Sequence, residues 1–259
     1  MTQDFTPMVD PIPAGELVGP VALVTGAAGG MGRAITRTLV AAGATTVYAL
    51  DRVAAEGEGI EGIVADLGDL DALAGLIAGL ERTPQVVVNA AGFYASRERF
   101  DFSAEEFRRT VDINLVAPFV IMREVSRRIE AEGLEGAVVN IASIAGKRGF
   151  PNAADYAASK GALMSLTRAA AMDLAPRLTV NAIAPGTVNT PMIDQVARDI
   201  AAKTGLPFAE QRAALVGDTP TGRIQEPNEV AAAVRFLAST SARSISGETL
   251  VIDGGVSRD

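Results

Sequence analysis

The sequence predicts an α/β protein in which a parallel sheet is covered by helices on both faces, and three observations support this. Short runs of β-branched and other apolar residues alternate along the chain with longer segments of helical periodicity. These short runs are apolar throughout, as expected of strands buried on both faces. A glycine cluster at 26–32 lies between the first run and the first helical segment. Together they predict a doubly wound, Rossmann-type sheet of seven parallel strands.

The first predicted unit is strand, helix, strand. Residues 21–24 (Val-Ala-Leu-Val) are predicted as a buried strand, and 31–42 as a helix that stops at Gly43. Residues 46–50 are predicted as the second strand, which ends at Asp51.

The middle of the chain continues this alternation. Residues 60–65 are predicted as the third strand and 86–88 as the fourth. Between them, 70–80 has apolar residues at helical spacing. Residues 104–132 are predicted as one or two helices.

The last part completes the sheet. We expect a fifth strand at 137–141, a long helix at 154–174 and a sixth strand at 178–183. A helix at 229–238 precedes the last strand, 249–252, which is closed by Asp-Gly-Gly.

The 259 residues fit one large α/β domain, and no repeat or linker suggests a second. We expect 18–259 to form a single catalytic domain and 1–17, which is acidic and proline-rich, to be an N-terminal tail. Residues 190–223 are less regular and are predicted to form a mobile lid over the site. The alternative for this segment is a loop that makes oligomer contacts.

Composition excludes several classes of function. The net charge of −8 argues against a general binder of nucleic acid or of acidic membranes, since both need a basic footprint. The chain has neither Cys nor His, which excludes disulfides, a Ser-His-Asp triad and a His-based zinc site, so no metal is expected. No apolar run is long enough to span a membrane, and the start lacks the features of an export signal. We expect a cytoplasmic protein that acts on a small molecule.

The glycine cluster predicts a dinucleotide site. Gly26 permits the tight turn after the first strand, Gly30 lets the backbone approach a pyrophosphate, and Gly32 allows close helix packing. The helix N-terminus then faces the anion.

Asp51 predicts which dinucleotide is bound. An acidic residue at the end of the second strand accepts hydrogen bonds from the ribose 2′-OH of NAD and repels the 2′-phosphate of NADP. Arg33 and Arg52 lie nearby in the sequence and offer the alternative of holding that phosphate.

Tyr156 and Lys160 are four residues apart, so they share one face of the predicted helix. A nearby ammonium favours the phenolate and is expected to lower the pKa of Tyr156. A tyrosine with a lowered pKa can exchange a proton with an alcohol or a ketone near neutral pH.

These motifs, taken in order, resemble those of the short-chain dehydrogenase/reductase family over residues 18–256. The family's TGxxxGxG matches residues 25–32, and its YxxxK matches Tyr156 and Lys160. Further matches at family spacing are Asn89-Ala90-Ala91-Gly92, Asn114, Ser143, and Pro185-Gly186 followed by Thr190. Ala90 is a small departure, since many members have a second Asn there.

The resemblance implies roles for four catalytic residues. Tyr156 is expected to be the general acid and base on the reacting hydroxyl. Lys160 is expected to lower its pKa and to hold the nicotinamide ribose. Ser143 is expected to orient the substrate oxygen, and Asn114 to anchor a water that connects Lys160 to solvent.

The resemblance and the position of each residue also predict the binding sites. The expected cofactor-binding residues are Gly26, Gly30, Met31, Gly32, Asp51, Arg52, Asp66, Leu67, Asn89, Ala90, Gly92, Tyr156, Lys160, Pro185, Gly186, Val188 and Thr190. The expected substrate-binding residues are Ser143, Ala145, Tyr94, Phe150, Asn152 and Met192.

The sequence therefore favours an NAD-dependent oxidoreductase that oxidises a secondary hydroxyl of a polyol, sugar or cyclic diol. One alternative is an NADPH-dependent 3-oxoacyl or other ketone reductase, against which Asp51 argues. Another is a non-catalytic NAD sensor, which would not need all four catalytic residues. The resemblance also implies a homotetramer formed through the helices that carry Asn114 and Tyr156, with a dimer as the alternative.

Overall fold

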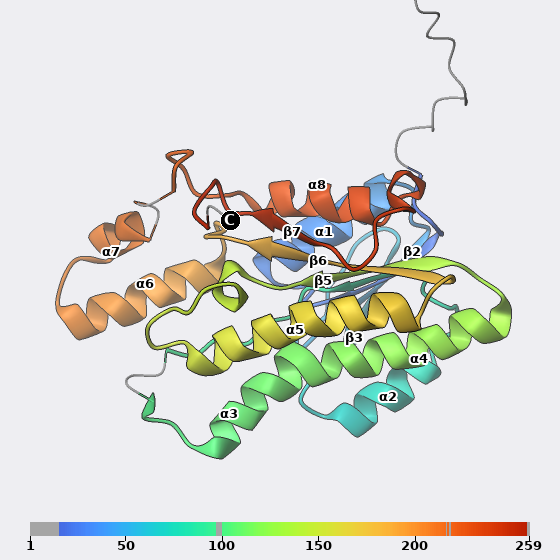
Figure 1. Cartoon of the computed structure of the whole chain (residues 1–259), viewed down its shortest axis with the longest axis horizontal. Coiled ribbons are helices and arrows are strands. Elements are labelled where there is room, and N and C mark those ends of the chain that lie inside the picture. Colours follow the sequence, from blue (N-terminus) through green and yellow to red (C-terminus); the bar gives the residue numbers. More distant parts are fainter. Residues whose placement is uncertain (1–15, 97–99, 216, 218, 258–259) are drawn as a thin grey trace, which may run out of the picture.

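The protein is built on one seven-stranded sheet (Figure 1). This computed structural model describes residues 16–96, 100–215, 217 and 219–257. The strands are β1 (Val21–Thr25), β2 (Thr46–Asp51), β3 (Ile60–Val64), β4 (Val86–Asn89), β5 (Gly136–Ile141), β6 (Leu178–Pro185) and β7 (Thr249–Ile252). Their order is β3-β2-β1-β4-β5-β6-β7 with every neighbouring pair parallel, which confirms the predicted sheet.

Helices cover both faces of the sheet. The α-helices of the described chain are α1 (Gly30–Ala41), α2 (Leu70–Ala78), α3 (Ala104–Val111), α4 (Ala117–Glu132), α5 (Ala154–Asp173), α6 (Pro191–Thr204), α7 (Phe208–Ala214) and α8 (Pro227–Leu237). Figure 1 shows α1 and α8 on one face and α2, α4 and α5 on the other.

Two hydrophobic cores result, because successive residues of a strand point to opposite faces. In β1, Leu23 packs in the core beneath α2, α4 and α5. Its neighbours Ala22 and Val24 pack in the core beneath α1 and α8. All three are fully buried, which explains why this strand is apolar from Val21 to Val24.

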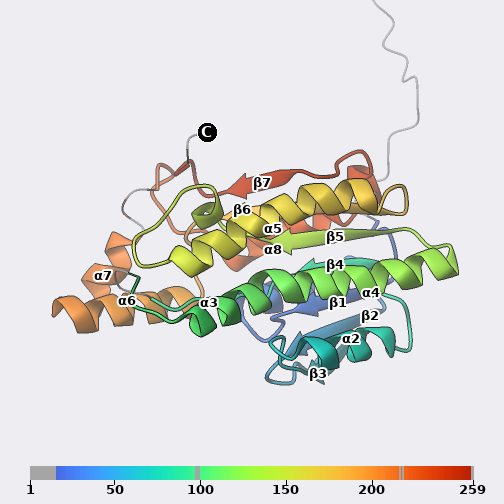
Figure 2. The ribbon, with the colours of Figure 1, turned by 60° about the horizontal axis from the view of Figure 1, so that its bottom comes forward.

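The order of the strands reverses between β1 and β4, where consecutive crossovers turn to opposite sides. In open parallel sheets, ligands bind outside the carboxyl ends of the strands at this switch point. Figure 2 shows that α6 and α7 extend from the same end of the sheet.

Residues 104–132 form an almost continuous helical rod. A capping box between Ser103 and Glu106 begins α3, and a left-handed Gly133 with φ of +66° ends α4. Between the two helices lies one π-helical turn, Asp112–Val116, which carries Asn114. Such turns are often found at functional sites.

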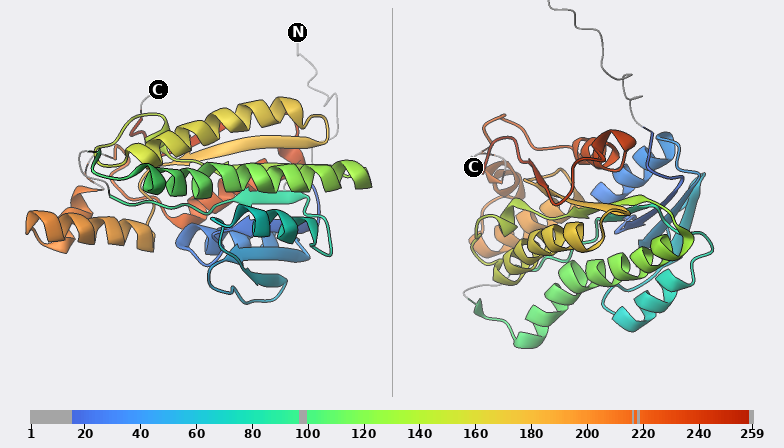
Figure 3. Two further views of the ribbon diagram at one scale, coloured as in Figure 1. Left: turned by 90° about the horizontal axis from the view of Figure 1, so that it is seen from below. Right: turned by 45° about the vertical axis from the view of Figure 1, so that its right-hand side comes forward.

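The prediction that 190–223 is irregular is wrong for most of its length. Thr190 precedes α6, Pro191 occupies its first turn, and α7 follows after a short connection. Figure 3 shows both helices projecting beyond the end of the sheet.

The predicted N-terminal tail lies outside the described residues except for its last two. Leu17 forms an antiparallel bridge with Ser239, and Glu16 accepts a hydrogen bond from Thr240, beyond the end of α8. None of the helices in the described part of the chain combines the length and apolar character needed to cross a bilayer.

Candidate active site

Two adjacent cavities lie at the carboxyl edge of the sheet. A groove of about 390 Å³ runs along the glycine loop and the ends of β2, β3 and β4. A second cavity of about 330 Å³ lies beside Ser143 and Tyr156. Met31, Thr190 and Met192 line both, so the groove and the cavity are neighbours there.

The glycine loop is a turn with no room for side chains. Gly26 has a φ of +66°, and a Cβ there would lie 2.7 Å from the Ala91 backbone. A Cβ on Gly32 would lie 2.0 Å from the Gly26 carbonyl oxygen, and one on Gly30 would lie 2.9 Å from the Thr190 side chain. Glycine at these positions keeps both the turn and the groove open.

The N-terminus of α1 fits a phosphate group. Gly29 provides no side-chain cap, the first turn holds no acidic residue, and residues 29–32 line the groove. The free N–H groups and the helix dipole at this end favour an anion. The residues present therefore fit the pyrophosphate of a dinucleotide.

Asp51 is held at the rim of the same groove. Its carboxylate accepts hydrogen bonds from the N–H of Ala28 at 3.0 Å and from its own neighbour Arg52 at 2.7 Å. A carboxylate has further lone pairs, so it can still accept from a ribose hydroxyl. Arg52 also lines the groove, whereas the guanidinium of Arg33 donates to the Ala28 carbonyl at 3.0 Å.

The far end of the groove contains residues that the sequence predicted and residues that it missed. Asp66 and Leu67 line it, as predicted for the adenine side. Phe93, Arg109 and Ile113 line it too, and the Arg109 guanidinium lies 5.4 Å from the Phe93 ring centroid. Arg109 and Ile113 are four residues apart and come just before Asn114. This helical spacing could have identified both as residues that face the groove.

Ser143 and Tyr156 meet at the inner end of the cavity. Ser143 follows β5, and its hydroxyl accepts a hydrogen bond from the Ala145 N–H at 3.1 Å. Its side chain is also hydrogen-bonded to Tyr156, in the first turn of α5. Tyr94 packs its ring edge against the Tyr156 ring, with centroids 5.4 Å apart and planes at 89°.

Lys160 lies behind Tyr156. Its ammonium is 5.9 Å from the Tyr156 ring centroid and donates to the Ile141 carbonyl at 2.7 Å. Burial lowers the pKa of Lys160 to about 8, because the charged form loses its hydration.

The prediction that the pKa of Tyr156 is lowered is wrong, because burial outweighs the neighbouring charge. Burial raises the pKa of Tyr156 above its ordinary value of 10.0, and the hydrogen bond with Ser143 opposes this shift only in part. Burial disfavours the charged form of each group.

Asn114 connects the β4–α3 loop with α5. Its side-chain oxygen accepts from the Phe93 N–H at 2.7 Å, and its amide donates to the Phe93 carbonyl at 2.9 Å. The same amide donates to the Ser159 hydroxyl at 3.0 Å. Ser159 precedes Lys160, so these contacts fix α5 beside the loop that follows β4.

The remaining predicted residues divide between the walls and the interior. Those that line one of the cavities are Ala90, Gly92, Tyr94, Ala145, Phe150, Pro185, Gly186, Val188, Thr190 and Met192. Asn89 lies inside the sheet, where its amide donates to Asn140 at 2.7 Å. Asn114, Lys160 and Asn152 are not wall residues of either cavity, and Asn152 is exposed with a φ of +60°.

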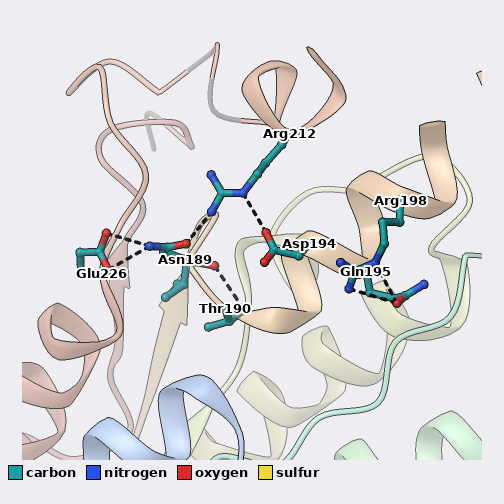
Figure 4. Close-up of polar contacts among 8 residues, drawn as sticks. Asn189, Thr190, Asp194, Gln195, Arg198, Arg212 and Glu226 are labelled. Carbon is teal, nitrogen blue, oxygen red and sulfur yellow. Dashed lines mark hydrogen bonds and ion pairs between the residues drawn. The ribbon is translucent and has the colours of Figure 1, made fainter. Parts of the chain in front are cut away.

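A polar network holds the segment around Thr190 (Figure 4). The Arg212 guanidinium, from α7, donates to the Asn189 side chain at 2.6 Å and to the Asp194 carboxylate, in α6, at 2.8 Å. Asn189 in turn donates to the Glu226 carboxylate at 3.1 Å. The segment after β6, both outer helices and the start of α8 are thus linked next to the residues that the two cavities share.

Among the described residues, no three Asp or Glu side chains gather closely enough to hold a metal ion. The residues that line the cavities offer hydroxyl, phenol and backbone groups for binding and proton transfer.

Comparisons with known proteins identify relatives of the whole described fold. The family model described as Enoyl-(Acyl carrier protein) reductase matches residues 26–257. A short-chain type dehydrogenase/reductase of Sinorhizobium fredii, itself uncharacterised, is 38% identical over 250 residues, which are 92% of this chain but 43% of that protein.

Two other relatives are matched over nearly their full length. The 3-oxoacyl-(acyl-carrier-protein) reductase of Rickettsia conorii is 33% identical over 251 residues, covering 93% of this chain and 98% of the relative. The trans-4-hydroxycyclohexanecarboxylate dehydrogenase of Sinomonas cyclohexanicum is 35% identical over 255 residues, covering 91% and 92%.

Two solved structures also resemble this chain over most of its length. A candidate NAD(P)-dependent gluconate 5-dehydrogenase from Beutenbergia cavernae, with bound NADP at low occupancy, superposes with a TM-score of 0.85 at 36% identity, covering 94% of this chain and 99% of that one. A 4-hydroxyisoleucine dehydrogenase complexed with NADH gives 0.80 at 28% identity, covering 93% and 100%. The chain belongs to the short-chain dehydrogenase/reductase family, whose fold binds a nicotinamide dinucleotide.

Proposed function

We propose that the protein transfers hydride between NAD(H) and a secondary alcohol or ketone, with polyols, sugars and cyclic diols as the candidate substrates. One observation carries the proposal: the hydrogen-bonded pair of Ser143 and Tyr156 lines a cavity that shares Met31 and Thr190 with the neighbouring dinucleotide groove. A substrate in that cavity meets a proton donor on one side and the cofactor groove on the other.

The chain's own residues act on the substrate oxygen. In oxidation, the Tyr156 phenolate accepts the proton of the alcohol, and in reduction the phenol returns it. The Ser143 hydroxyl donates to the same oxygen and orients it. The bound cofactor supplies the hydride acceptor or donor at C4 of its nicotinamide and, when oxidised, a positive charge that favours the phenolate.

The buried ammonium of Lys160 stabilises that phenolate electrostatically. Burial alone raises the pKa of Tyr156, so ionisation requires positive charge close to its ring. Lys160, over the ring, provides part of it when protonated. We also assign Lys160 the binding of the nicotinamide ribose, and Asn114 the binding of a water on the proton path.

The position of Asp51 supports NAD over NADP. Its carboxylate is fixed at the groove rim beside Ala28, where a 2′-phosphate would meet negative charge. Arg52 is the residue that would have to offset this repulsion.

The same experiment tests two alternative functions. The relative from Rickettsia conorii, named as a 3-oxoacyl reductase, supports a reductase of acyl substrates. A non-catalytic NAD sensor is the alternative from another class.

The test is turnover by the wild type and by Tyr156→Phe, with cofactor binding measured in both. An enzyme of the proposed kind loses about 10²–10⁴-fold in kcat and keeps its cofactor affinity. A sensor would show no turnover in either protein, and a 3-oxoacyl reductase would prefer NADPH with an acyl thioester.

We propose further that the protein is cytoplasmic, that residues 18–259 form one catalytic domain, and that 190–223, with α6 and α7, acts as a lid over the cavity. We propose a homotetramer, for which exposed apolar residues give support. Phe119 on α4, Met172 on α5 and Leu250 on β7 are 44%, 81% and 38% exposed.

A further inference from the structure

The cavity in front of Tyr156 has mainly apolar walls. α6 contributes Met192, Ile193, Val196 and Ile200, and the segment after β5 contributes Ile144 and Phe150. Among the described residues, no Asp, Glu, Lys or Arg lines it. The walls can therefore form few side-chain hydrogen bonds with a ligand.

The hydroxyl groups that do line the cavity are mostly engaged. Thr187 donates to the Leu215 carbonyl at 3.2 Å, and Thr190 donates to the Val188 carbonyl at 3.3 Å. If the proposed function is right, Ser143 and Tyr156 both serve the reacting oxygen. Tyr94 then remains as the wall phenol for a second polar group of the substrate.

Tyr94 is well placed for that role. Its ring packs edge-to-face on Tyr156, and its hydroxyl, already hydrogen-bonded to Ser96, can form a second hydrogen bond because a phenol both donates and accepts. Because Tyr94 lies beside Tyr156, we expect a substrate hydroxyl next to the reacting carbon to meet this phenol. We expect hydroxyls further around a ring to meet the apolar side chains of α6.

We infer that the substrate is a compact and mainly apolar secondary alcohol or ketone, ring-shaped or branched, with at most one hydroxyl besides the reacting one. This inference rests on the proposed function and chooses among its candidate substrates. It favours cyclic alcohols and diols over sugars and other polyols.

The size of the cavity agrees with a compact substrate. At about 330 Å³ it is near the lower end of the range of about 300–1,000 Å³ found for small-molecule sites. Part of that volume adjoins the cofactor groove through Met31, Thr190 and Met192. A six-membered ring fits the remainder better than a long acyl chain.

The expected differences in kcat/KM between substrates depend on how many hydroxyl groups each substrate carries. An apolar pocket rejects one additional hydroxyl by about 10²-fold in kcat/KM. When a ring carries several additional hydroxyl groups that lie far enough apart to act independently, their effects on kcat/KM multiply. Together they should lower kcat/KM by about 10⁴-fold or more.

The test compares cyclohexanol, trans-1,2-cyclohexanediol and myo-inositol, which share one carbon ring and differ in their hydroxyl groups. With NAD as the cofactor, kcat/KM for the first two should exceed that for myo-inositol by about 10⁴-fold. Equal or faster oxidation of myo-inositol or gluconate would overturn the inference. Faster reduction of acetoacetyl-CoA than of cyclohexanone would overturn it as well.

A binding measurement separates this inference from the proposed function. Tyr156→Phe protein saturated with NAD is titrated calorimetrically with cyclohexanol and with myo-inositol. Preferential binding of cyclohexanol without turnover in the wild type would contradict the proposed function and support the inference. Tighter binding of myo-inositol, or binding of neither, would contradict the inference whatever the turnover.

A matched pair of variants tests the apolar wall itself. Val196→Thr adds a hydroxyl at nearly constant volume, so the ratio of kcat/KM for cyclohexanol to that for myo-inositol, whose further hydroxyls face α6, should fall by about tenfold. Val196→Ala removes volume without adding polarity and should change both substrates alike. An unchanged ratio in Val196→Thr would show that this wall does not select the substrate.

Discussion

Lys160 is buried, and its ammonium donates to the Ile141 carbonyl at 2.7 Å. Burial lowers its pKa from 10.5 to about 8, so in the folded protein it loses its proton earlier than in the unfolded chain. Between these values the unfolded state binds more protons, and the free energy of unfolding therefore rises with pH. Below pH 8 the folded protein bears the full destabilisation that comes from burying the charged form of Lys160. This destabilisation disappears as the pH approaches 10.5.

We predict that Lys160→Met removes this dependence. The free energy of unfolding of the wild type, relative to the variant, should increase by about 2 kcal/mol between pH 8 and pH 10. Urea titrations of both proteins at several pH values measure the difference. A difference that stays constant over this range would contradict the assigned pKa shift.

Asp51 gives a prediction about cofactor choice. Asp51→Asn removes the charge but keeps an acceptor for the Ala28 N–H, so the glycine loop should keep its shape. We expect the Kd for NADP to fall by about tenfold or more, because a like-charge repulsion is lost. Asp66→Asn, at the adenine end of the same groove, is the matched control and should not change the preference. Fluorescence titration with both dinucleotides gives the values.

Single residues also show the limits of the sequence. Four-residue spacing was enough to place Tyr156 and Lys160 side by side, because helical geometry is regular. It did not predict that the Tyr156 pKa is raised, because the burial that raises it depends on how segments distant in the chain pack around the phenol.

At the scale of elements, strands were predicted within about two residues, since the inner strands are runs of mainly apolar residues buried on both faces. The edge strands β3 and β7 are only partly buried. The helices α6 and α7 were missed although α6 repeats apolar residues at helical spacing from Met192 to Ile200. They project from the edge of the molecule and bury few residues. The π-helical turn at Asn114 has no local signal, because the sequence on either side is equally compatible with an α-helix.

Arg212 connects these outer helices to the site, which gives a prediction at this scale. Arg212→Ala removes the bonds to Asn189 and Asp194 beside Thr190 (Figure 4). We expect a several-fold rise in KM for substrate and cofactor, because the segment around Thr190 loses its support. The free energy of unfolding should fall by less than about 1 kcal/mol, since the ion pair is partly exposed.

The control for Arg212 lies on the same surface. Gln195, in α6, hydrogen-bonds Asp199 one turn further along the helix. Gln195→Ala should leave KM unchanged. An equal rise in KM for both variants would mean that the effect comes from general loosening of α6 rather than from the Arg212 contacts.

At the scale of the whole molecule, the sheet order brings the functional groups together. The reversal between β1 and β4 opens the crevice into which the glycine loop and the end of β4 project, and Ser143 follows the neighbouring strand β5. The site was predictable to this extent because parallel strands carry their carboxyl ends to one edge. The apolar wall formed by α6 was predicted only at Met192, because α6 lies about 40 residues beyond Tyr156 in the chain.

The proposed tetramer is tested at this scale. Light scattering should give about 107 kDa, four times the chain mass of 26.7 kDa. Phe119→Glu places a charge on the exposed face of α4 and should lower the mass. Val64, in the edge strand β3, is also exposed, and Val64→Glu should leave the molecular mass unchanged. A wild-type monomer would contradict the proposal.

The central claim is direct hydride transfer with Tyr156 moving the proton. It is tested by oxidising cyclohexanol that carries deuterium on the carbinol carbon and analysing the cofactor by mass spectrometry. The wild type should place one deuterium in each NADH formed, and Tyr156→Phe should do so at least about 10²-fold more slowly. Absence of the label from the NADH that forms, or an unchanged rate in Tyr156→Phe, would contradict the mechanism.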